Sequence, residues 1–330
     1  TPPFSAGDYP LSRITAVCSV ERQAARPARP LPRKVVPMRR LLLGIAFIVL
    51  ASSAPAQAGP VLEDVVSTKA HEEHPTASAG FEAWSVYERQ NDAWSVYARQ
   101  TGGTRFKVNG SRRGAVTGAI DGTTLVYQSF TRRSSSIRFF DLLTKTTSSA
   151  PEAVNTDAWE YWPSLSGDLL LFGRETGDGD RDLILYDLST ETETVLDHTN
   201  GTRRNIQPGQ VNGNYAVWVT FTPSSCQAYV HDIAAGTTTA VPRPDDRCQY
   251  GASVGSDGTA YVGQSAFGCG RHVQLLAYPV GGSVSQVVSL ERGTDFLFTF
   301  ALTDAVGSTS VYLDPGPCGG KPDIAKVTTV

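Results

Sequence analysis

The residues best suited to covalent chemistry form a Gly-x-Ser-x-Gly motif, Gly251 to Gly255, with Ser253 at its centre. In many hydrolases this motif is a strand-to-helix turn that exposes the serine hydroxyl as a nucleophile. Here a turn and a second apolar run, from Thr259 onward, follow the motif instead of a helix. We therefore interpret the segment as an inner strand with small side chains and assign no catalytic residue to it.

Two further stretches resemble metal sites without completing one. Asp178 to Asp182 alternates carboxylates as a calcium loop does, but Leu183 replaces the required glycine and Ser189 the bidentate glutamate. His71 to His74 reads H-E-E-H and lacks the H-E-x-x-H spacing of zinc peptidases. We predict a solvated loop at the first stretch, with weak calcium binding as the alternative, and no metal site or cofactor.

The elements that would position any site are repeats. A glycine turn, an apolar strand, a polar loop and a strand ending in aromatic-Asp-aliphatic recur along the chain. The marker glycines of five copies, spaced by 45, 46, 45 and 49 residues, are Gly122, Gly167, Gly213, Gly258 and Gly307. An earlier copy begins at Gly80, where two Ala-Trp-Ser-Val-Tyr runs flank an Asn91-Asp92 turn. We interpret these two runs as a hairpin, which makes six repeats.

Six repeats of this length with about four short strands each predict an all-β fold, a six-bladed β-propeller of four-stranded blades. No segment shows convincing helical periodicity over eleven residues. A β-sandwich is the main alternative, but it does not explain the repeating period. The last repeat stops after its third strand, so we expect Val61 to Val66 to supply the fourth and close the ring.

The first 58 residues have the pattern of a leader. Two arginines follow Met38, the only methionine, and an apolar stretch from Leu41 to Ala51 precedes an Ala-Gln-Ala cleavage site before Gly59. This order is typical of a secretory signal, and a membrane anchor is the alternative. We predict an upstream, disordered segment at 1–37, a signal peptide at 38–58 and one propeller domain at 59–330.

The charge balance excludes one class of partner. The chain has 29 Lys and Arg against 32 Asp and Glu, a net charge of −3. Without residues 1–58, 21 basic and 30 acidic residues remain, a net charge of −9. An acidic exported protein repels phosphate backbones, so we expect no nucleic acid partner. We expect a secreted, extracytoplasmic monomer with no stable membrane insertion after signal cleavage.

Four cysteines lie outside the leader, and an even number in an oxidising compartment suggests two disulfides. Cys226, Cys269 and Cys318 each lie 11 to 13 residues after their marker glycine, in the loop between the second and third strands. Cys248 lies in a connection between blades, which emerges on the same face of a propeller. Three pairings are possible. We favour Cys226–Cys248 and Cys269–Cys318.

Two segments carry a family resemblance: Pro163 to Asp168, PSLSGD, and Arg181 to Asp187, RDLILYD. They resemble the TolB-type, WD40-like propeller repeat, although Leu165 stands where that repeat has tryptophan. The resemblance covers roughly residues 75–330. TolB has an α/β domain ahead of its propeller, which residues 59–74 cannot build, so TolB's partner contacts are not expected here. The resemblance implies a binding platform, although a few similar propellers are enzymes.

Propellers bind ligands at the mouth of the central channel, where the connections between blades converge. We expect the ligand-binding residues there, from three successive repeats: Trp159, Tyr161, Trp162, Arg204, Asn205, Gln207, Gln249 and Tyr250. Aromatic rings beside amide and guanidinium groups suit a sugar or a peptide. The alternative is that Trp159 and Trp162 wedge between blades as core residues.

These observations favour a binding or scaffold module for an extracellular protein, peptide or carbohydrate at the channel mouth, and not an enzyme. The alternative is an extracellular hydrolase or lyase acting on carbohydrate or ester substrates. A constellation of carboxylates or histidines around the channel would favour the enzyme.

Overall fold

The computed structural model is built of β-strands. It describes residues 61–66, 68, 70–78, 80–110, 113–176, 179–200, 204–244, 247–265, 272–291, 301–305, 308–313 and 324–329. The leader predicted at 1–58, Asp178, Cys269 and Cys318 lie outside the described residues. None of the described residues forms a helix long and apolar enough to cross a membrane.

Five sheets each contain four consecutive strands in chain order, every strand antiparallel to its neighbours. The first two are β2 (His71–Ser78), β3 (Phe81–Glu88), β4 (Ala93–Gln100), β5 (Phe106–Lys107), and β6 (Gly114–Asp121), β7 (Thr124–Phe130), β8 (Ser135–Asp141), β9 (Thr146–Ser149). The next two are β10 (Trp159–Ser166), β11 (Leu169–Glu175), β12 (Arg181–Asp187), β13 (Thr192–Thr199), and β14 (Asn205–Asn212), β15 (Tyr215–Thr222), β16 (Ser225–Asp232), β17 (Thr237–Ala240). The fifth is β18 (Cys248–Val254), β19 (Ala260–Ser265), β20 (His272–Tyr278), β21 (Ser285–Glu291).

A further four-stranded sheet joins the two ends of the described chain. Its order is β1 (Val61–Val66), β24 (Ile324–Thr329), β23 (Ser308–Leu313) and β22 (Ala301–Ala305). The β1 strand also touches the first sheet, because the Arg99 guanidinium donates a 3.0 Å hydrogen bond to the carbonyl of Val65. Next to Val65, the side chain of Val66 packs against Trp84 of the first sheet.

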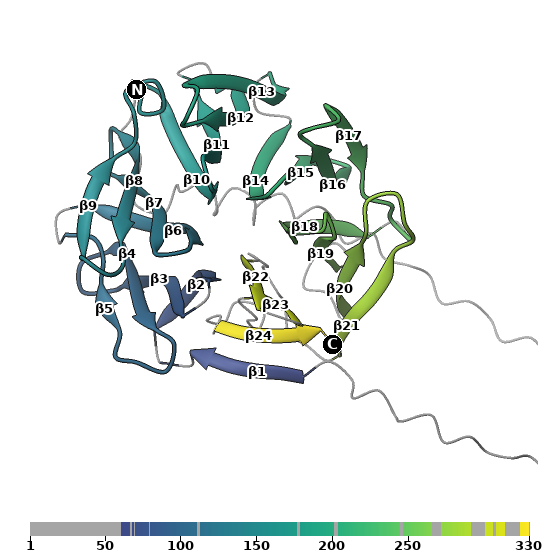
Figure 1. Ribbon diagram of the computed structural model, residues 1–330, viewed down its shortest axis with the longest axis horizontal. Coiled ribbons are helices and arrows are strands. Elements are labelled where there is room, and N and C mark those ends of the chain that lie inside the picture. The colour runs from purple at the N-terminus through teal and green to yellow at the C-terminus, as the bar shows by residue number, and fades with distance from the viewer. Residues whose placement is uncertain are drawn as a thin grey trace, which may run out of the picture.

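The sheets stand radially around a central axis, and the first strand of each set lies nearest that axis (Figure 1). Each innermost strand contacts the innermost strand of the next sheet, from β2 through β6, β10, β14 and β18. In turn, β22 contacts both β18 and β2. This arrangement confirms the predicted all-β propeller. The predicted hairpin around Asn91-Asp92 is confirmed as well, since β3 and β4 pair in register across it.

The apolar core lies between neighbouring sheets, which explains why the second strands are hydrophobic on both faces. Leu170 and Phe172 of β11 are fully buried, and they pack with Val126 and Ile137 of the preceding sheet. Burying each such side chain contributes about 1.5–3 kcal/mol. Neighbouring sheets share no strand, and apolar side-chain packing therefore holds each sheet to the next.

Amide side chains fix the connections between sheets to the third strand of the sheet just completed. Asn109, Asn155 and Gln249 each accept a hydrogen bond from a backbone N–H, in β4, β8 and β16, at 2.8, 2.6 and 2.8 Å. Asn155 also donates to the carbonyl of Ile137 in β8, and Gln249 donates to the carbonyl of Val241 just after β17. The connections are therefore held in place by side chains where the strand ladder ends.

The Cys226–Cys248 disulfide is confirmed, with 4.8 Å between the two Cα atoms. Cys226 lies inside β16 and not in the loop before it, and Cys248 is the first residue of β18. Both cysteines are buried, at 3% and 0% exposure. The bond thus ties the third strand of one sheet to the innermost strand of the next.

Candidate ligand-binding channel

The innermost strands of the five consecutive sheets share an irregularity that shapes the channel. Each one shifts register against the second strand of its sheet near mid-length, as a β-bulge does. The shifts lie at Glu73/Thr76, Thr117/Ile120, Tyr161/Ser164, Pro208/Val211 and Tyr250/Ala252. A bulge bends the strand and changes the direction of a side chain. Five bulges at equivalent positions therefore turn side chains toward one axis.

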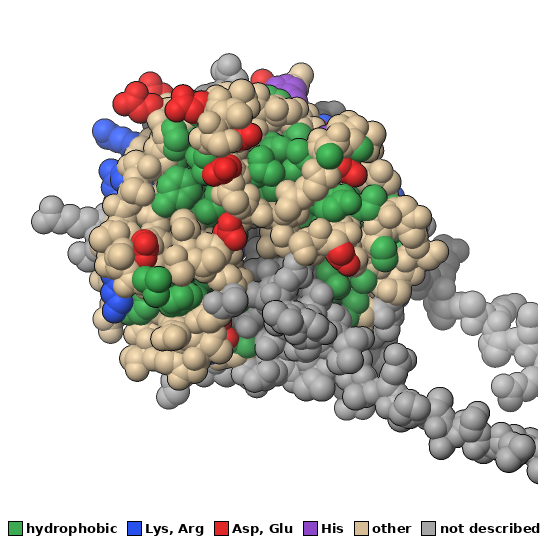
Figure 2. Space-filling view, in the orientation of Figure 1, with side chains coloured by type: hydrophobic (Ala, Val, Ile, Leu, Met, Phe, Trp, Pro, Cys, Tyr) green, Lys and Arg blue, Asp and Glu red, His purple; other side chains and the backbone are tan. Residues whose placement is uncertain are grey.

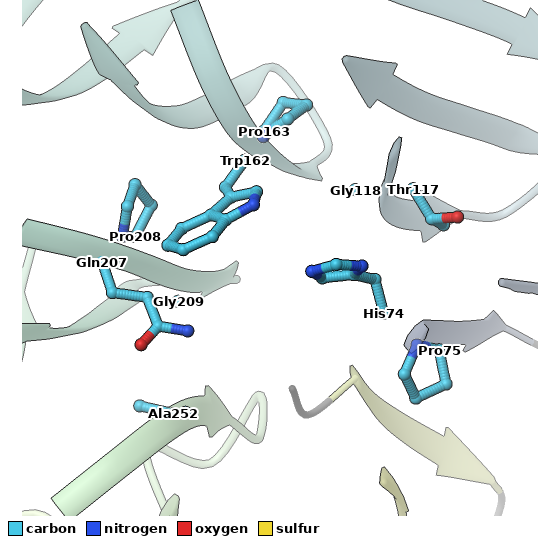
Figure 3. Close-up of a pocket in the computed structure, with 11 residues that line it drawn as sticks. His74, Pro75, Thr117, Gly118, Trp162, Pro163, Gln207, Pro208, Gly209 and Ala252 are labelled. Carbon is cyan, nitrogen blue, oxygen red and sulfur yellow. The ribbon is translucent and has the colours of Figure 1, made fainter. Parts of the chain in front are cut away.

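A narrow cavity of about 50 Å³ lies where these bulges meet. It is lined by residues in or next to the five bulges, namely His74, Pro75, Thr117, Gly118, Trp162, Pro163, Gln207, Pro208, Gly209, Gly251 and Ala252. Figure 3 shows the rings of His74 and Trp162 facing this space from two sides, with the Gln207 amide on a third. The acidic side chains scattered over the face in Figure 2 are not among the described lining residues.

Two of the bulges hold an unusual backbone conformation. His74 and Trp162 have φ values of 53° and 47°, in the left-handed region that non-glycine residues seldom adopt. A proline follows each of them. A residue held in this region costs about 1–3 kcal/mol, so the surrounding sheet must enforce it. Such outliers cluster at functional sites, which supports a role for these two side chains beyond packing.

Two glycines bring neighbouring sheets into contact at the channel wall. A Cβ atom on Gly118 would lie 2.2 Å from the carbonyl oxygen of Pro163 in the next sheet. A Cβ on Gly209 would lie 2.5 Å from the carbonyl oxygen of Ala252. Both distances are far below van der Waals contact, so only glycine permits this spacing. The channel wall therefore combines large aromatic side chains with glycines that have no side chain.

The histidine in the wall is neutral near pH 7. His74 is only 5% exposed, and burial lowers its pKa, although the Glu73 carboxylate 3.9 Å away acts in the opposite direction. Burial tends to raise the pKa of Glu73, but a hydrogen bond with His71 brings it below the usual value. The wall thus offers an uncharged imidazole with an ionised carboxylate behind it.

Aromatic contacts fix the histidine. Its ring centroid lies 6.4 Å from that of Trp162 and 6.1 Å from that of Trp94. Trp162 in turn packs edge-on against Tyr161, with the ring centroids 5.8 Å apart. These contacts orient the imidazole and indole across the cavity, where they can stack on a ligand while the Gln207 amide donates and accepts hydrogen bonds.

Two of the eight residues expected at the channel mouth line the cavity, Trp162 and Gln207. Trp159 packs against Phe130, with the ring centroids 6.3 Å apart, in the seam between two sheets. Tyr161 is buried and donates a 3.3 Å hydrogen bond to the carbonyl of Ile206, and burial raises its pKa. The alternative expected for both tryptophans, a core position wedged between blades, therefore applies to Trp159.

The other four residues lie away from the cavity lining. The Arg204 guanidinium pairs with the Asp197 carboxylate at 2.9 Å, and Asn205 accepts a hydrogen bond from Arg181. Gln249 is fully buried in the backbone contacts already described. Tyr250 packs near Phe221 at 6.2 Å between ring centroids. The structure therefore does not bring these four together with Trp162.

Sequence reasoning missed His74, which was considered only as part of an incomplete zinc motif. A signal was present in the repeats, because His74-Pro75 and Trp162-Pro163 are the same kind of dipeptide, two periods apart. Aligning the repeats on proline as well as glycine would have placed the two rings in equivalent positions.

The other candidate chemistries find little support in the described residues. Ser253 is buried within β18, and the strand β19 follows it where a nucleophile elbow needs a helix. Asp182 pairs with His198 at 2.6 Å. Across the part of the chain that the structure describes, no group of three or more His, Cys, Asp and Glu side chains is arranged to hold a metal ion.

Comparison with known proteins identifies the fold. No protein-family model and no curated protein matches the sequence. TolB from Acinetobacter baumannii superposes with a TM-score of 0.52 at 17% identity, over 76% of this chain and 64% of that one. A putative TolB from Agrobacterium tumefaciens gives 0.53 at 12% identity, over 82% and 97% of the two chains. The propeller domain of the trilobed protease of Pyrococcus furiosus gives 0.50 at 10% identity, over 78% and 93%.

These likenesses establish a TolB-like β-propeller. The chain spans about two thirds of the length of the Acinetobacter TolB. At identities of 10 to 17%, the comparison concerns the fold alone.

Proposed function

We propose that this TolB-like propeller is an exported binding module whose central channel receives part of a protein or peptide ligand. The observation that carries the proposal is the pair His74 and Trp162, both held with positive φ so that their rings face one cavity. Strained residues that enclose a cavity are typical of a ligand clamp. Gln207 supplies hydrogen bonds beside them.

The size of the cavity favours a peptide over a carbohydrate. On this measure a single water molecule needs about 10–15 Å³, so a cavity of about 50 Å³ holds only a few water-sized groups, which suits the tip of a side chain. A sugar ring would have to remain outside it. A peptide lying across the channel mouth would insert one side-chain tip into this cavity, beside the imidazole and the indole.

We also propose that the sheet containing β1 serves as the sixth blade and closes the ring. The antiparallel pairing of β1 with β24 supports this, as do the contacts of β22 with β18 and β2. The hydrogen bond from Arg99 to Val65 adds a link between β1 and the first sheet. A closed ring would keep the channel wall rigid.

Export is the third part of the proposal. The buried Cys226–Cys248 disulfide supports an oxidising compartment, as does the order of basic, apolar and small residues after Met38. N-terminal sequencing of the exported protein should give a start near Gly59. A mature protein beginning at Thr1 would contradict export through this signal.

Selection from a random linear peptide library tests the channel. Peptides that bind the wild-type protein should bind Trp162→Gly at least ten-fold more weakly, because glycine accepts the positive φ while removing the ring. Leu143→Ala is the control, since Leu143 is 67% exposed and absent from the cavity lining. Equal binding by Trp162→Gly, or no binding peptide at all, would refute a peptide-binding channel.

The same preparation tests the enzymatic alternative. Turnover of ester or glycoside substrates that disappears in Trp162→Gly would identify the channel as an extracellular hydrolase or lyase site. Turnover that is insensitive to this substitution would belong to another site or to a contaminant.

A further inference from the structure

A second cavity lies at the seam between the β2–β5 sheet and the β6–β9 sheet. It has a volume of about 490 Å³, within the range of small-molecule sites, and it shares no described lining residue with the channel. Six of its lining residues have polar side chains, namely Asn109, Arg113, Tyr127, Ser129, Arg138 and Thr147. No carboxylate is found among the described lining residues. The cavity therefore presents two guanidinium groups without a lining acid.

The loop that carries Arg113 is held in place by a buried amide. Asn109 is 7% exposed and accepts a 2.8 Å hydrogen bond from the backbone N–H of Val96 in β4. Its amide nitrogen donates to the carbonyls of Gly110 and Arg113, at 3.2 and 3.0 Å. These bonds fix the start of β6 to the first sheet. Among the described residues, the exposed Arg113 guanidinium has no hydrogen-bond or ion-pair partner.

Arg138 is the second arginine in the lining. It lies on β8, directly opposite Tyr127 of β7 and Ser149 of β9. Within the described part of the chain its guanidinium donates one hydrogen bond, of 2.5 Å, to the Ser149 hydroxyl. A guanidinium carries five N–H donors, so most of them are left for a ligand.

The Tyr127 phenol contributes a neutral polar group. Tyr127 is 4% exposed, and burial raises its pKa, although a hydrogen bond with Thr147 and the charge of Arg138 act in the opposite direction. The phenol therefore keeps its proton near pH 7, when it can act as a donor. Ser129 on the same strand is also buried and adds a second hydroxyl.

The charge of this region contrasts with the rest of the molecule. The chain as a whole is acidic, with a net charge of −3. Figure 2 shows Lys and Arg side chains at the edge formed by the first two sheets, whereas Asp and Glu side chains are scattered over the face. A two-arginine cavity on an acidic protein is an electrostatic trap for small anions.

We propose that this cavity binds a small molecule bearing a phosphate or sulfate group, which is held by Arg113 from the connection before β6 and by Arg138 from β8. Planar guanidinium forks match the oxygen geometry of such anions and bind them through charge-assisted hydrogen bonds. The hydroxyls of Tyr127, Ser129 and Thr147 supply further hydrogen bonds. The volume leaves room for an organic body attached to the anion.

Titration calorimetry on the full chain tests the proposal, with inorganic phosphate, inorganic sulfate, glucose 6-phosphate and glucose as probes. At least one anionic probe should bind and glucose should not, and binding should weaken as sodium chloride is raised. Arg113→Ala and Arg138→Ala should each weaken binding by ten-fold or more. Arg132→Ala is the matched control, because Arg132 is exposed nearby and is not a lining residue.

The probes also separate the sources of the anion. Tighter binding of glucose 6-phosphate than of inorganic phosphate would indicate a phosphorylated metabolite, and equal binding would indicate the free ion. Trp162→Gly should bind the anion as the wild type does, so failure of the peptide proposal would leave this one intact. No binding of any anion, or equal binding by both arginine variants with unchanged melting temperatures, would overturn the proposal.

Discussion

The channel and the seam cavity are built from the same repeats, yet they offer opposite chemistry. The channel takes its residues from bulges on innermost strands and presents His74, Trp162 and Gln207 in a space of about 50 Å³. The seam cavity takes its residues from regular strands and one connection, and it presents two arginines in about 490 Å³. A propeller therefore produces different sites according to whether side chains point along the axis or into the joint between blades.

The difference also lies in what holds each site. The channel depends on contacts among five sheets, because its wall includes residues from all of them. The seam cavity depends on two neighbouring sheets and on the Asn109 amide. A substitution or deletion far from the seam between the first two sheets should therefore affect the channel and leave the seam cavity unchanged.

Deleting β1 should have the largest effect. Without Val61–Val66, the edge of β24 loses its antiparallel partner and Arg99 loses its bond to Val65. We expect a loss of several kcal/mol in the free energy of unfolding, or association through the bare edge. Denaturant unfolding and light scattering would measure these outcomes. A deletion variant that is monomeric and as stable as the wild type would show that β1 does not close the ring.

Breaking the disulfide should have the next largest effect. The Cys226–Cys248 bond closes a loop across 22 residues beside the part of the channel wall that β18 supplies. Cys226→Ser with Cys248→Ser should lower the free energy of unfolding by about 3 kcal/mol, with anion binding at the distant seam retained. Denaturant curves with and without reductant provide the measurement. An unfolding midpoint that is the same with and without reductant would contradict this account.

One methyl group should distinguish the two sites. Gly118→Ala places a Cβ 2.2 Å from Pro163 O and 2.8 Å from Val126 O, both backbone atoms that cannot rotate away. We expect a loss of about 2 kcal/mol. Gly110→Ala, in the seam cavity, meets no atom within 4 Å and should change stability by less than about 0.5 kcal/mol. Similar melting temperatures for the two variants would contradict the tight contact at the channel wall.

The pH dependence of stability should reveal the buried imidazole. Because burial lowers the pKa of His74 in the folded state, the unfolded chain binds a proton first as the pH falls below 6.5. Stability is therefore lost as the pH falls from 6.5 to the lower folded pKa of His74, and the full loss remains below that pKa. Glu73 acts in a separate window, below pH 4.5, because its own pKa is lowered.

Replacing the imidazole tests this assignment. His74→Gln should flatten the loss of stability just below pH 6.5. His198→Gln should not, because the hydrogen bond with Asp182 raises the pKa of that exposed imidazole. An unchanged slope in His74→Gln would show that the imidazole does not titrate as a buried group.

The fold was predictable because its signals are local and repeated. The described marker glycines and apolar runs fall where the turns and second strands lie. The repeat positions of the cysteines predicted the pairing of Cys226 with Cys248, although Cys226 lies in β16 and not in a loop. The site was less predictable because a bulge breaks the two-residue alternation of a strand. Gln249 resembles a ligand-binding amide in sequence, but its oxygen accepts the backbone N–H of Ala228. Such a contact depends on neighbouring sheets, which one repeat does not reveal.

A crystal structure of the protein with its tightest selected peptide tests the central claim most directly. We predict that one side-chain tip of the peptide lies in the channel cavity, in contact with the His74 and Trp162 rings, and that its polar group contacts the Gln207 amide. The seam cavity should contain no part of the peptide. A peptide bound in that cavity or on the outer strands, with the channel residues untouched, would contradict the assignment of the channel as the ligand site.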